Sequence, residues 1–381
     1  MRAFLSYIAP FGMVFSLCLA GCGDDTGIFP HAKDAATLVE DAGIEAPPAE
    51  DTATAIDSGT VVLDGGLIAP ATATIIVLPD TQYYTYSAAS GFYTAPDHAG
   101  VFGEQIDWIL ASRNSLNIQA VLHVGDIVDI PDDAEQWKIA GTAMHRLDGL
   151  IPYVVVPGNH DSDAKRSGPM DRHFGPETMP WITGTEIIGQ MENNYALVDI
   201  GGKPWLVVAL EFSPTDATVA WADKVLKAYP DRTAILLTHA YLYSDGTRYD
   251  LSVAGTDESQ STYQYWYPQR YAFTPSEGMN DGEMLYQKLV SPNSNVRLVF
   301  SGHQTGVTGG ARLTSTRPDG TVVHQMLSDY QWLNGEWYGY GYLRIVQLDF
   351  AGQTIRIRTY SPDLNQYLAD DTNQFDLPMN L

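Results

Sequence analysis

Three polar side chains that could bind a metal ion or move a proton follow one another at Asn159, His160 and Asp161. They come directly after the β-branched run 154–156 and a Pro-Gly turn, a pattern that predicts a buried strand ending at this point. In a layered α/β protein, ligands gather where the carboxyl ends of strands leave the sheet. Alone, this tip is equally compatible with an ordinary polar turn.

The same arrangement recurs at four other places. Apolar runs predict strands at 75–78, 118–124, 234–237 and 296–300. The candidate ligands that follow these runs are, in order, Asp80, Asp126, His239 and His303. Each alone has an ordinary role, because aspartates cap helices and isolated histidines usually satisfy structural hydrogen bonds. Five strand ends of one kind indicate a shared site, and this mixed oxygen and nitrogen set suits one or two Fe, Mn or Zn ions.

The elements that must position these residues alternate along the chain. Helical spacing of apolar residues predicts helices at 102–116, 132–147, 217–228 and 282–290, between the strands. Residues 195–200 and 205–210 predict a hairpin, and 322–327, 341–348 and 354–359 predict antiparallel strands. The fold class is therefore α/β. No Gly-x-Ser-x-Gly motif occurs, which argues against a serine hydrolase of the α/β type.

Composition and charge narrow the function further. The chain has 381 residues, of which 45% are hydrophobic, and a formal net charge of −25. Such an acidic protein is not expected to bind nucleic acid specifically or by general attraction. A site for phosphate esters in it needs a local cationic centre, which bound divalent metal ions supply.

The N-terminus predicts export. Arg2 precedes an uncharged stretch, 3–23, that ends in Leu19-Ala20-Gly21-Cys22 and resembles a bacterial lipobox. We therefore expect a lipoprotein signal peptide at 1–21, a lipid on Cys22, an acidic disordered linker at 22–70 and a folded domain at 71–381. A plain transmembrane anchor is the alternative. Either reading gives a membrane-anchored protein outside the cytoplasm, periplasmic or on the cell surface.

The motifs resemble, in order and type, those of the calcineurin-like metallophosphoesterases across about residues 75–306. They are Asp80-x-Gln82, Gly125-Asp126-x-x-Asp129, Gly158-Asn159-His160-Asp161, His239 and Gly302-His303. Three segments resemble an exported bacterial branch of this superfamily: Asp80-Thr81-Gln82-Tyr83-Tyr84, Thr238-His239-Ala240-Tyr241-Leu242 and Asp329-Tyr330-Gln331. The resemblance implies a calcineurin-like four-layer α/β/β/α sandwich of two mixed sheets, preceded here by the signal peptide and linker.

The resemblance also implies roles for the residues. Asp126 would bridge two metals, and the remaining metal ligands would be Asp80 and Gln82 for one site and Asn159, His239 and His303 for the other. A metal-activated hydroxide would then hydrolyse a phosphate monoester or diester, in a small molecule or a polymer. His160 would protonate the leaving oxygen. Asp129 would orient His160, or would instead cap a helix.

Two positions depart from the family pattern. Gln82 and Thr305 stand where the family usually has histidines, so the half-site of Asp80 could be looser, suited to a harder ion, or empty. This departure motivates an alternative function, a catalytically weak or inactive surface-anchored binding module on the same fold.

Other features lie outside the motifs. The long insertion 241–275 is interpreted as a lid or substrate wall, or as a self-packed loop. Its Arg248 and Arg270 are candidates for binding the phosphate of a substrate, or are solvated surface charges. His123, within a predicted strand, is expected to be a core histidine.

Overall fold

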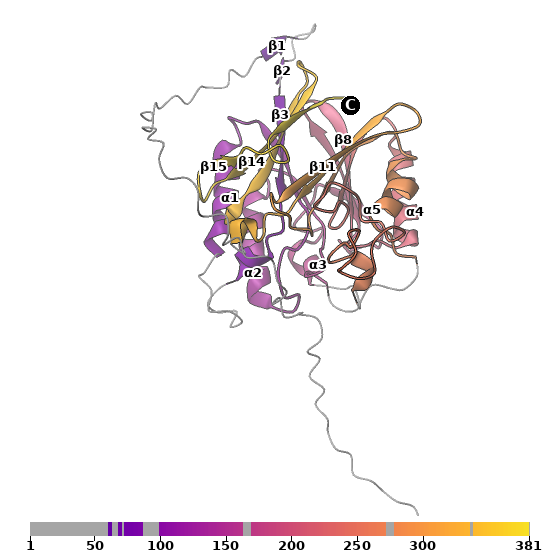
Figure 1. Ribbon diagram of the computed structural model, residues 1–381. Coiled ribbons are helices and arrows are strands. Elements are labelled where there is room, and N and C mark those ends of the chain that lie inside the picture. The colour runs from indigo at the N-terminus through magenta and orange to yellow at the C-terminus, as the bar shows by residue number, and fades with distance from the viewer. Residues whose placement is uncertain are drawn as a thin grey trace, which may run out of the picture. The chain divides into compact units, whose positions relative to one another are not determined.

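The protein consists of two facing sheets with helices on their outer faces (Figure 1). The computed structural model describes residues 60–62, 68–70, 72–86, 99–162, 169–271, 278–335 and 338–380. The predicted signal peptide and Cys22 lie outside the described residues. Among the described helices, none has the length and apolar character needed to cross a membrane.

The strands of the first sheet are β6 Ile182–Thr185, β7 Asn194–Ile200, β8 Lys203–Leu210, β9 Thr233–Thr238, β10 Val296–Ser301, β11 Gly310–Thr316 and β12 Val322–Ser328. Their spatial order is β11-β12-β10-β9-β8-β7-β6. The strands of the second sheet are β3 Thr72–Leu78, β4 Ile118–His123, β5 Tyr153–Val155, β13 Leu343–Asp349, β14 Thr354–Ser361, β15 Gln366–Leu368 and β16 Phe375–Pro378. Their order is β15-β14-β13-β3-β4-β5, and β16 also pairs with β14.

Two short strands, β1 Thr60–Val62 and β2 Ile68–Pro70, pair antiparallel within the region predicted to be a disordered linker. The compact unit that contains every described residue is Asp57–Leu381.

The helices confirm most of the predicted positions. The α-helices are α1 Ala99–Ser112, α2 Ala134–Met144, α3 Met170–His173, α4 Asp216–Ala228 and α5 Gly282–Leu285. A π-helix, η4 Tyr286–Val290, continues α5. The 3₁₀-helices are η1 Gln82–Thr85, η2 His145–Leu147, η3 Pro268–Arg270, η5 Leu333–Gly335 and η6 Gly339–Gly341.

Three hydrophobic clusters separate four layers. One lies between α1, α2 and the second sheet, one lies between the two sheets, and one lies between the first sheet and α4 and α5. The strands divide their side chains between clusters with a period of two, as a pleated strand buried on both faces requires. In β10, for example, Leu298 and Phe300 enter the cluster between the sheets, whereas Val299 faces the helices. The predicted four-layer sandwich of two mixed sheets is thus confirmed.

The parallel strands bring their carboxyl ends to shared edges. β3, β4 and β5 are mutually parallel in one sheet, and β8, β9, β10 and β12 are parallel in the other. The prediction that 322–327 is an antiparallel strand is therefore only half right. β12 is antiparallel to β11 but parallel to β10, so its end lies at the same edge as the end of β10.

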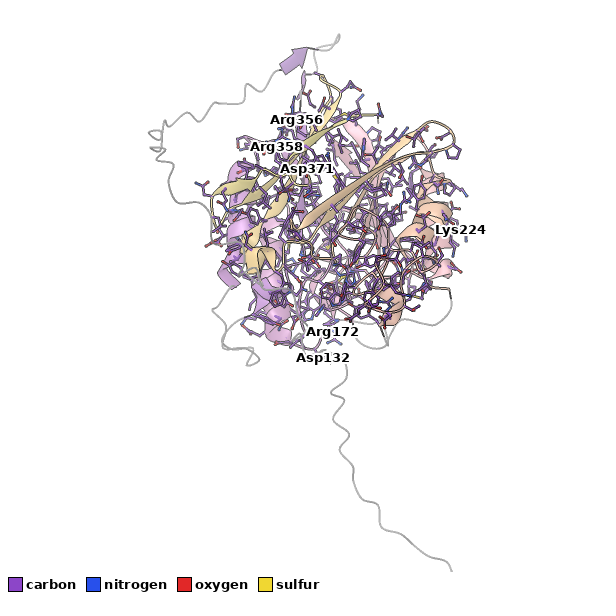
Figure 2. The ribbon with its side chains drawn as sticks, viewed as in Figure 1. Asp132, Arg172, Lys224, Arg356, Arg358 and Asp371 are labelled. Carbon is purple, nitrogen blue, oxygen red and sulfur yellow. The ribbon has the colours of Figure 1, made fainter. Side chains whose placement is uncertain are left out.

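The labelled basic side chains belong to the outer elements of the molecule (Figure 2). On β14, Arg356 pairs with Asp349 at 2.7 Å and Arg358 pairs with Asp376 at 2.9 Å. These partly exposed pairs contribute little stability each. These two arginines are therefore paired with carboxylates that are distant in sequence from the candidate ligands.

We predict that Phe300→Ala lowers the free energy of unfolding by about 3–5 kcal/mol, because it empties a fully buried site between the sheets. Chemical denaturation followed by circular dichroism measures the change. Val307→Ala is the matched control, because Val307 is 97% exposed and its change should stay within about 0.5 kcal/mol. Equal effects of the two substitutions would contradict the assignment of Phe300 to the shared core.

Candidate metal centre

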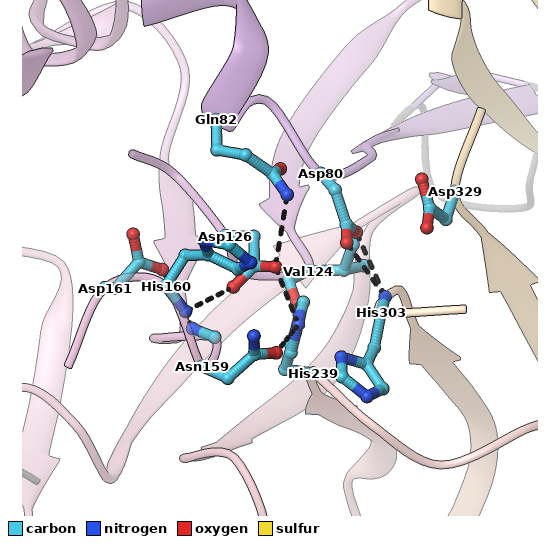
Figure 3. A network of polar contacts seen from close by, with 12 residues as sticks. Asp80, Gln82, Val124, Asp126, Asn159, His160, Asp161, His239, His303 and Asp329 are labelled. Atoms are coloured by element: carbon cyan, nitrogen blue, oxygen red, sulfur yellow. Dashed lines mark hydrogen bonds and ion pairs between the residues drawn. The ribbon is translucent and has the colours of Figure 1, made fainter. Parts of the chain in front are cut away.

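Four of the predicted ligands come together at the carboxyl ends of four strands (Figure 3). Asp126 follows β4, Asn159 follows β5, His239 follows β9 and His303 follows β10. Ligand atoms of Asp126, His239 and His303 lie within 4.8 Å of one another. Asp126 and His303 hold positive φ angles of 50° and 74°, a backbone conformation that is uncommon for residues other than glycine.

The imidazole of His239 shows why this cluster needs a cation. Its Nδ1 donates to the carbonyl oxygen of Val124 at 2.8 Å, which leaves Nε2 as the nitrogen with a lone pair in the neutral ring. Nε2 faces the amide oxygen of Asn159 at 3.1 Å and Oδ2 of Asp126 at 3.3 Å. Three acceptor atoms therefore converge, and only a proton or a metal ion between them removes the repulsion.

The pKa of the His239 imidazole is shifted by these neighbours. Burial lowers the pKa of His239, but the charge and the hydrogen bond of Asp126 outweigh burial and raise the pKa above its ordinary value. Burial also raises the pKa of Asp126, but the charges of His239 and His160 outweigh it and lower the pKa overall. A divalent ion on the same atoms would take over the stabilisation that the proton gives.

His303 is fixed with its second nitrogen available. Its Nε2 donates to the carbonyl oxygen of Trp266 at 2.7 Å, so Nδ1 carries the lone pair. Burial, followed by the nearby charge of His239, lowers the pKa of His303 to about 3. The neutral ring is the form that binds metals.

The second half-site, around Asp80 and Gln82, also fits a metal ion. Both oxygens of Asp80 accept from the backbone N–H of His303, at 3.2 and 2.9 Å. The amide Nε2 of Gln82 donates to Oδ2 of Asp126 at 3.3 Å, whereas its Oε1 is buried without a hydrogen-bond partner. A buried acceptor without a partner is costly and calls for a missing donor or ion. Coordination through Oε1 would satisfy it.

Thr305 does not replace the missing imidazole. Its hydroxyl donates a hydrogen bond to the carbonyl oxygen of Gln331. This matches the expectation that the half-site of Asp80 lacks the two histidines of the family pattern.

The centre gathers four carboxyl groups below the surface. Asp80, Asp126, Asp161 and Asp329 are each at most 3% exposed. Burial, followed by the charges of Asp329 and Asp126, raises the pKa of Asp80 well above its usual range. Burial likewise raises the pKa of Asp329 to about 7. Within the described residues, no lysine or arginine forms an ion pair with any of the four.

His160 and Asp129 form the predicted pair. Nδ1 of His160 lies 3.1 Å from Oδ1 of Asp129 and 3.0 Å from its carbonyl oxygen. Burial lowers the pKa of His160, but the charges of Asp126 and Asp129 outweigh burial and raise it to about 10. The ring is therefore a proton-bearing group whose orientation Asp129 sets. The alternative role of Asp129 is not observed, because the N-cap of α2 is Asp133.

Two positioning residues were not assigned roles from the sequence. The carboxylate of Asp161 accepts from the backbone N–H groups of Ile127 and Val128, at 2.8 and 2.9 Å, and of Gly158, at 2.8 Å. It therefore ties the loop that carries Asp126 to the loop that carries Asn159. The only available signal was its place at the end of the Gly-Asn-His-Asp motif.

His123 is fully buried, as expected of a core histidine, yet it also supports the centre. Its Nδ1 accepts from the N–H of Gly125 at 3.2 Å, so Nε2 carries the proton and donates to Thr81 Oγ1 at 2.9 Å. Burial lowers the pKa of His123 to about 3, which keeps the ring neutral. His123 thus joins the Asp80 loop to the Asp126 loop.

The described part of the insertion, up to residue 271, has features of both interpretations, a substrate wall and a self-packed loop. Tyr249 and Tyr267 are buried in a cluster of their own with Phe212, and the carbonyl of Trp266 holds His303. It is a self-packed segment that forms part of the wall of the centre.

The structure gives no support to the two arginines of the insertion as substrate ligands. Arg248 donates to Gln325, Glu283 and Ser315, with its guanidinium 3.5 Å above the ring of Tyr286. Arg270 donates to the carbonyl oxygens of Gln264 and Gly255 and lies over the ring of Tyr263. Both hold the insertion together, and none of these partners belongs to the metal centre.

Glycines allow the loops to approach the carboxylates closely. A Cβ at Gly158 would lie 2.0 Å from Oδ1 of Asp126, and one at Gly302 would lie 2.0 Å from Oδ1 of Asp80. Either atom would have to displace a ligand of the centre.

We predict that Gly158→Ala weakens metal binding by at least about tenfold, because its methyl group pushes Asp126 out of place. Isothermal titration with Mn²⁺ measures the affinity. Gly103→Ala in α1 is the control, because its Cβ would meet nothing within 4 Å and Ala favours the helix. Unchanged affinity in Gly158→Ala would show that Asp126 is not held where the structure places it.

A family model and several known proteins match this chain. The family model of calcineurin-like phosphoesterases matches residues 73–305. Protein YvnB of Bacillus subtilis is 32% identical over 323 residues, which cover 81% of this chain but only 22% of that relative's length. Purple acid phosphatase PPD1 from yellow lupin has 16% identity, a TM-score of 0.47, and coverage of 81% of this chain and 54% of its own. The 5'-nucleotidase from Candida albicans has 12% identity and a TM-score of 0.38, and the match covers 81% of this chain and 52% of that protein. The chain belongs to the calcineurin-like phosphoesterase family.

Proposed function

We propose that this protein hydrolyses a phosphate ester, a monoester or a diester, with one or two divalent metal ions of the kind Mn, Fe or Zn. The observation that supports this most is that oxygens of Asp126 and Asn159 both lie beside Nε2 of His239. His303 offers Nδ1 and Gln82 offers Oε1 to the same centre. This donor set fits divalent ions, and family membership supports phosphoester hydrolysis in general.

Bound divalent ions would neutralise the phosphoryl oxygens and lower the pKa of water toward neutrality. The chain's own residues do the rest. His160, protonated and held by Asp129, stands ready to give its proton to the leaving oxygen of the ester. Its side chain is 35% exposed, so a substrate can reach it.

We further propose that the protein works outside the cytoplasm, anchored to a membrane by a lipid on Cys22. The support is the charge-free stretch 3–23 and the Leu-Ala-Gly-Cys sequence that ends at Cys22. The acidic segment that follows would keep the enzyme at a distance from the anchor.

The Gln82 and Thr305 half-site favours one alternative, a binding module on the same fold that has lost catalysis. The two proposals differ in what the purified protein holds. An enzyme of this mechanism retains tightly bound metal, whereas the module is expected to hold less than one equivalent.

We predict that Asp126→Asn, which keeps the shape of the side chain and removes its charge, lowers kcat/KM toward phosphate esters by about 10³-fold. The reason is the loss of several kcal/mol of interaction with the metal ions. Chelation of the wild-type protein should abolish turnover, and added Mn²⁺ should restore it. Turnover of p-nitrophenyl phosphate and of bis-p-nitrophenyl phosphate measures both effects. Wild-type activity no higher than that of Asp126→Asn would contradict the proposed function.

His160→Asn is predicted to slow hydrolysis of an alkyl phosphate by about 10²–10⁴-fold, because the alkoxide leaving group needs a proton. Hydrolysis of p-nitrophenyl phosphate should fall much less, since p-nitrophenolate leaves without one. His145→Asn is the control, because His145 bonds to Asp148 and Tyr153 rather than to the centre. An equal loss with both leaving groups would show that His160 does not act as the acid.

A further inference from the structure

A sixth strand end reaches the edge where the metal centre lies. β12 runs parallel to β10, with Ser301 opposite Leu327. Two residues beyond this pair, the backbone reaches His303 after β10 and Asp329 after β12. The parallel direction of β12 therefore brings Asp329 to the centre by the same rule that brings the ligands on the other strands.

Asp329 lies beside Asp80, whose carboxylate it faces in Figure 3. The two residues are 1% and 3% exposed. The side chain of Asp329 accepts one hydrogen bond from the described residues, from the N–H of Gln331 at 3.1 Å. Burying two adjacent carboxylates without a cation is costly.

A second observation points to a ligand at this place. Oε1 of Gln82 is buried beside the same carboxylates and lacks a hydrogen-bond partner in the described structure. Its neighbours are acceptors rather than donors, so a cation is the partner that suits all of them.

The substitution at Thr305 explains how Asp329 comes to be there. The Thr305 hydroxyl donates to the carbonyl oxygen of Gln331, and the N–H of the same Gln331 donates to Asp329. The N–H of Asp329 is fixed in turn by the carbonyl oxygen of Gly309 at 2.9 Å. Thr305 thus holds the Asp329–Gln331 segment where an imidazole would otherwise reach the metal.

We propose that Asp329 supplies a carboxylate ligand to the metal site of Asp80 and Gln82, in place of the imidazole that the chain lacks at Thr305. With Asp126, the site then has oxygen ligands throughout, whereas the neighbouring site has two imidazoles. Oxygen ligands favour a harder ion such as Mn²⁺ or Mg²⁺ over Zn²⁺ at this site. The proposal rests on the metal centre that the proposed function requires.

The first test counts metal ions on the purified full chain. After dialysis against Mn²⁺, elemental analysis should find about two ions per wild-type chain and about one per Asp329→Asn chain, with the weaker site's affinity reduced at least about tenfold. Asp319→Asn is the matched control, because Asp319 accepts from the N–H two residues ahead of it as Asp329 does, but in an exposed hairpin. It should keep two ions.

The second test separates a ligand from a structural residue. If Asp329 is a ligand, Asp329→Asn should melt no lower than the wild type without metal, because a buried carboxylate has been removed. Added Mn²⁺ should then raise its Tm less than it raises that of the wild type. A structural role would instead lower the metal-free Tm and leave the rise caused by Mn²⁺ unchanged, which would overturn the proposal.

The outcomes also separate this proposal from the proposed function. A wild-type chain that holds no metal would refute the centre as a whole. A wild-type chain that holds two ions, with two equally tight ions in Asp329→Asn, would refute the role of Asp329 alone. One ion in both proteins would refute that role as well.

Discussion

Repulsion among buried acceptors is the constraint on which the rest of this structure depends. Asp80, Asp126 and Asp329 lie under the surface, together with Nε2 of His239 and the amide oxygen of Gln82, and the half-buried Asn159 adds its own amide oxygen. An assembly of this kind costs several kcal/mol unless cations occupy it. The protein therefore carries a site whose unfavourable electrostatics in the free state become favourable when divalent ions bind. In an acidic chain, this local reversal of charge would let the proposed phosphate ester approach.

Holding the acceptors together against their repulsion requires a rigid backbone. Asp161 gathers three N–H groups from two loops, and the N–H of His303 is given to Asp80. His123 and Thr81 join the remaining pair of loops, and Thr81 also gives its N–H to the carbonyl of Asp126. Because these bonds run between ends of different strands, the parallel sheets fix the geometry before any ion is present. The sheets in turn depend on the three apolar clusters that hold the four layers.

The sequence predicted the features whose signal is local, and it did not predict those that depend on how strands pair. Strong apolar runs ending in polar motifs placed β3, β4, β5, β9 and β10 and the candidate ligands that follow them, because each signal is contained in about ten residues. The direction of β12 relative to β10 is set by the crossover between them, and periodicity in 322–327 carries no record of it. The strands β6, β11, β15 and β16 were missed for a related reason, since pairing rather than composition makes them strands.

Arg248 and Arg270 illustrate a different limit of sequence-based prediction. The residue type shows what a side chain can bind, but it does not show which partners the side chain contacts in the fold. A guanidinium in an acidic protein meets many acceptors, and here Glu283, Gln325 and backbone carbonyls take up its donors. The same logic works in reverse at Thr305. In the sequence, threonine at this position only removes an imidazole ligand. In the structure, the Thr305 hydroxyl bonds to a segment that carries the carboxylate of Asp329. A departure from a family pattern therefore has to be judged by what the new side chain brings with it. At this centre, the exchange of a nitrogen ligand for an oxygen ligand alters which ion is preferred without removing the reason for an ion to bind.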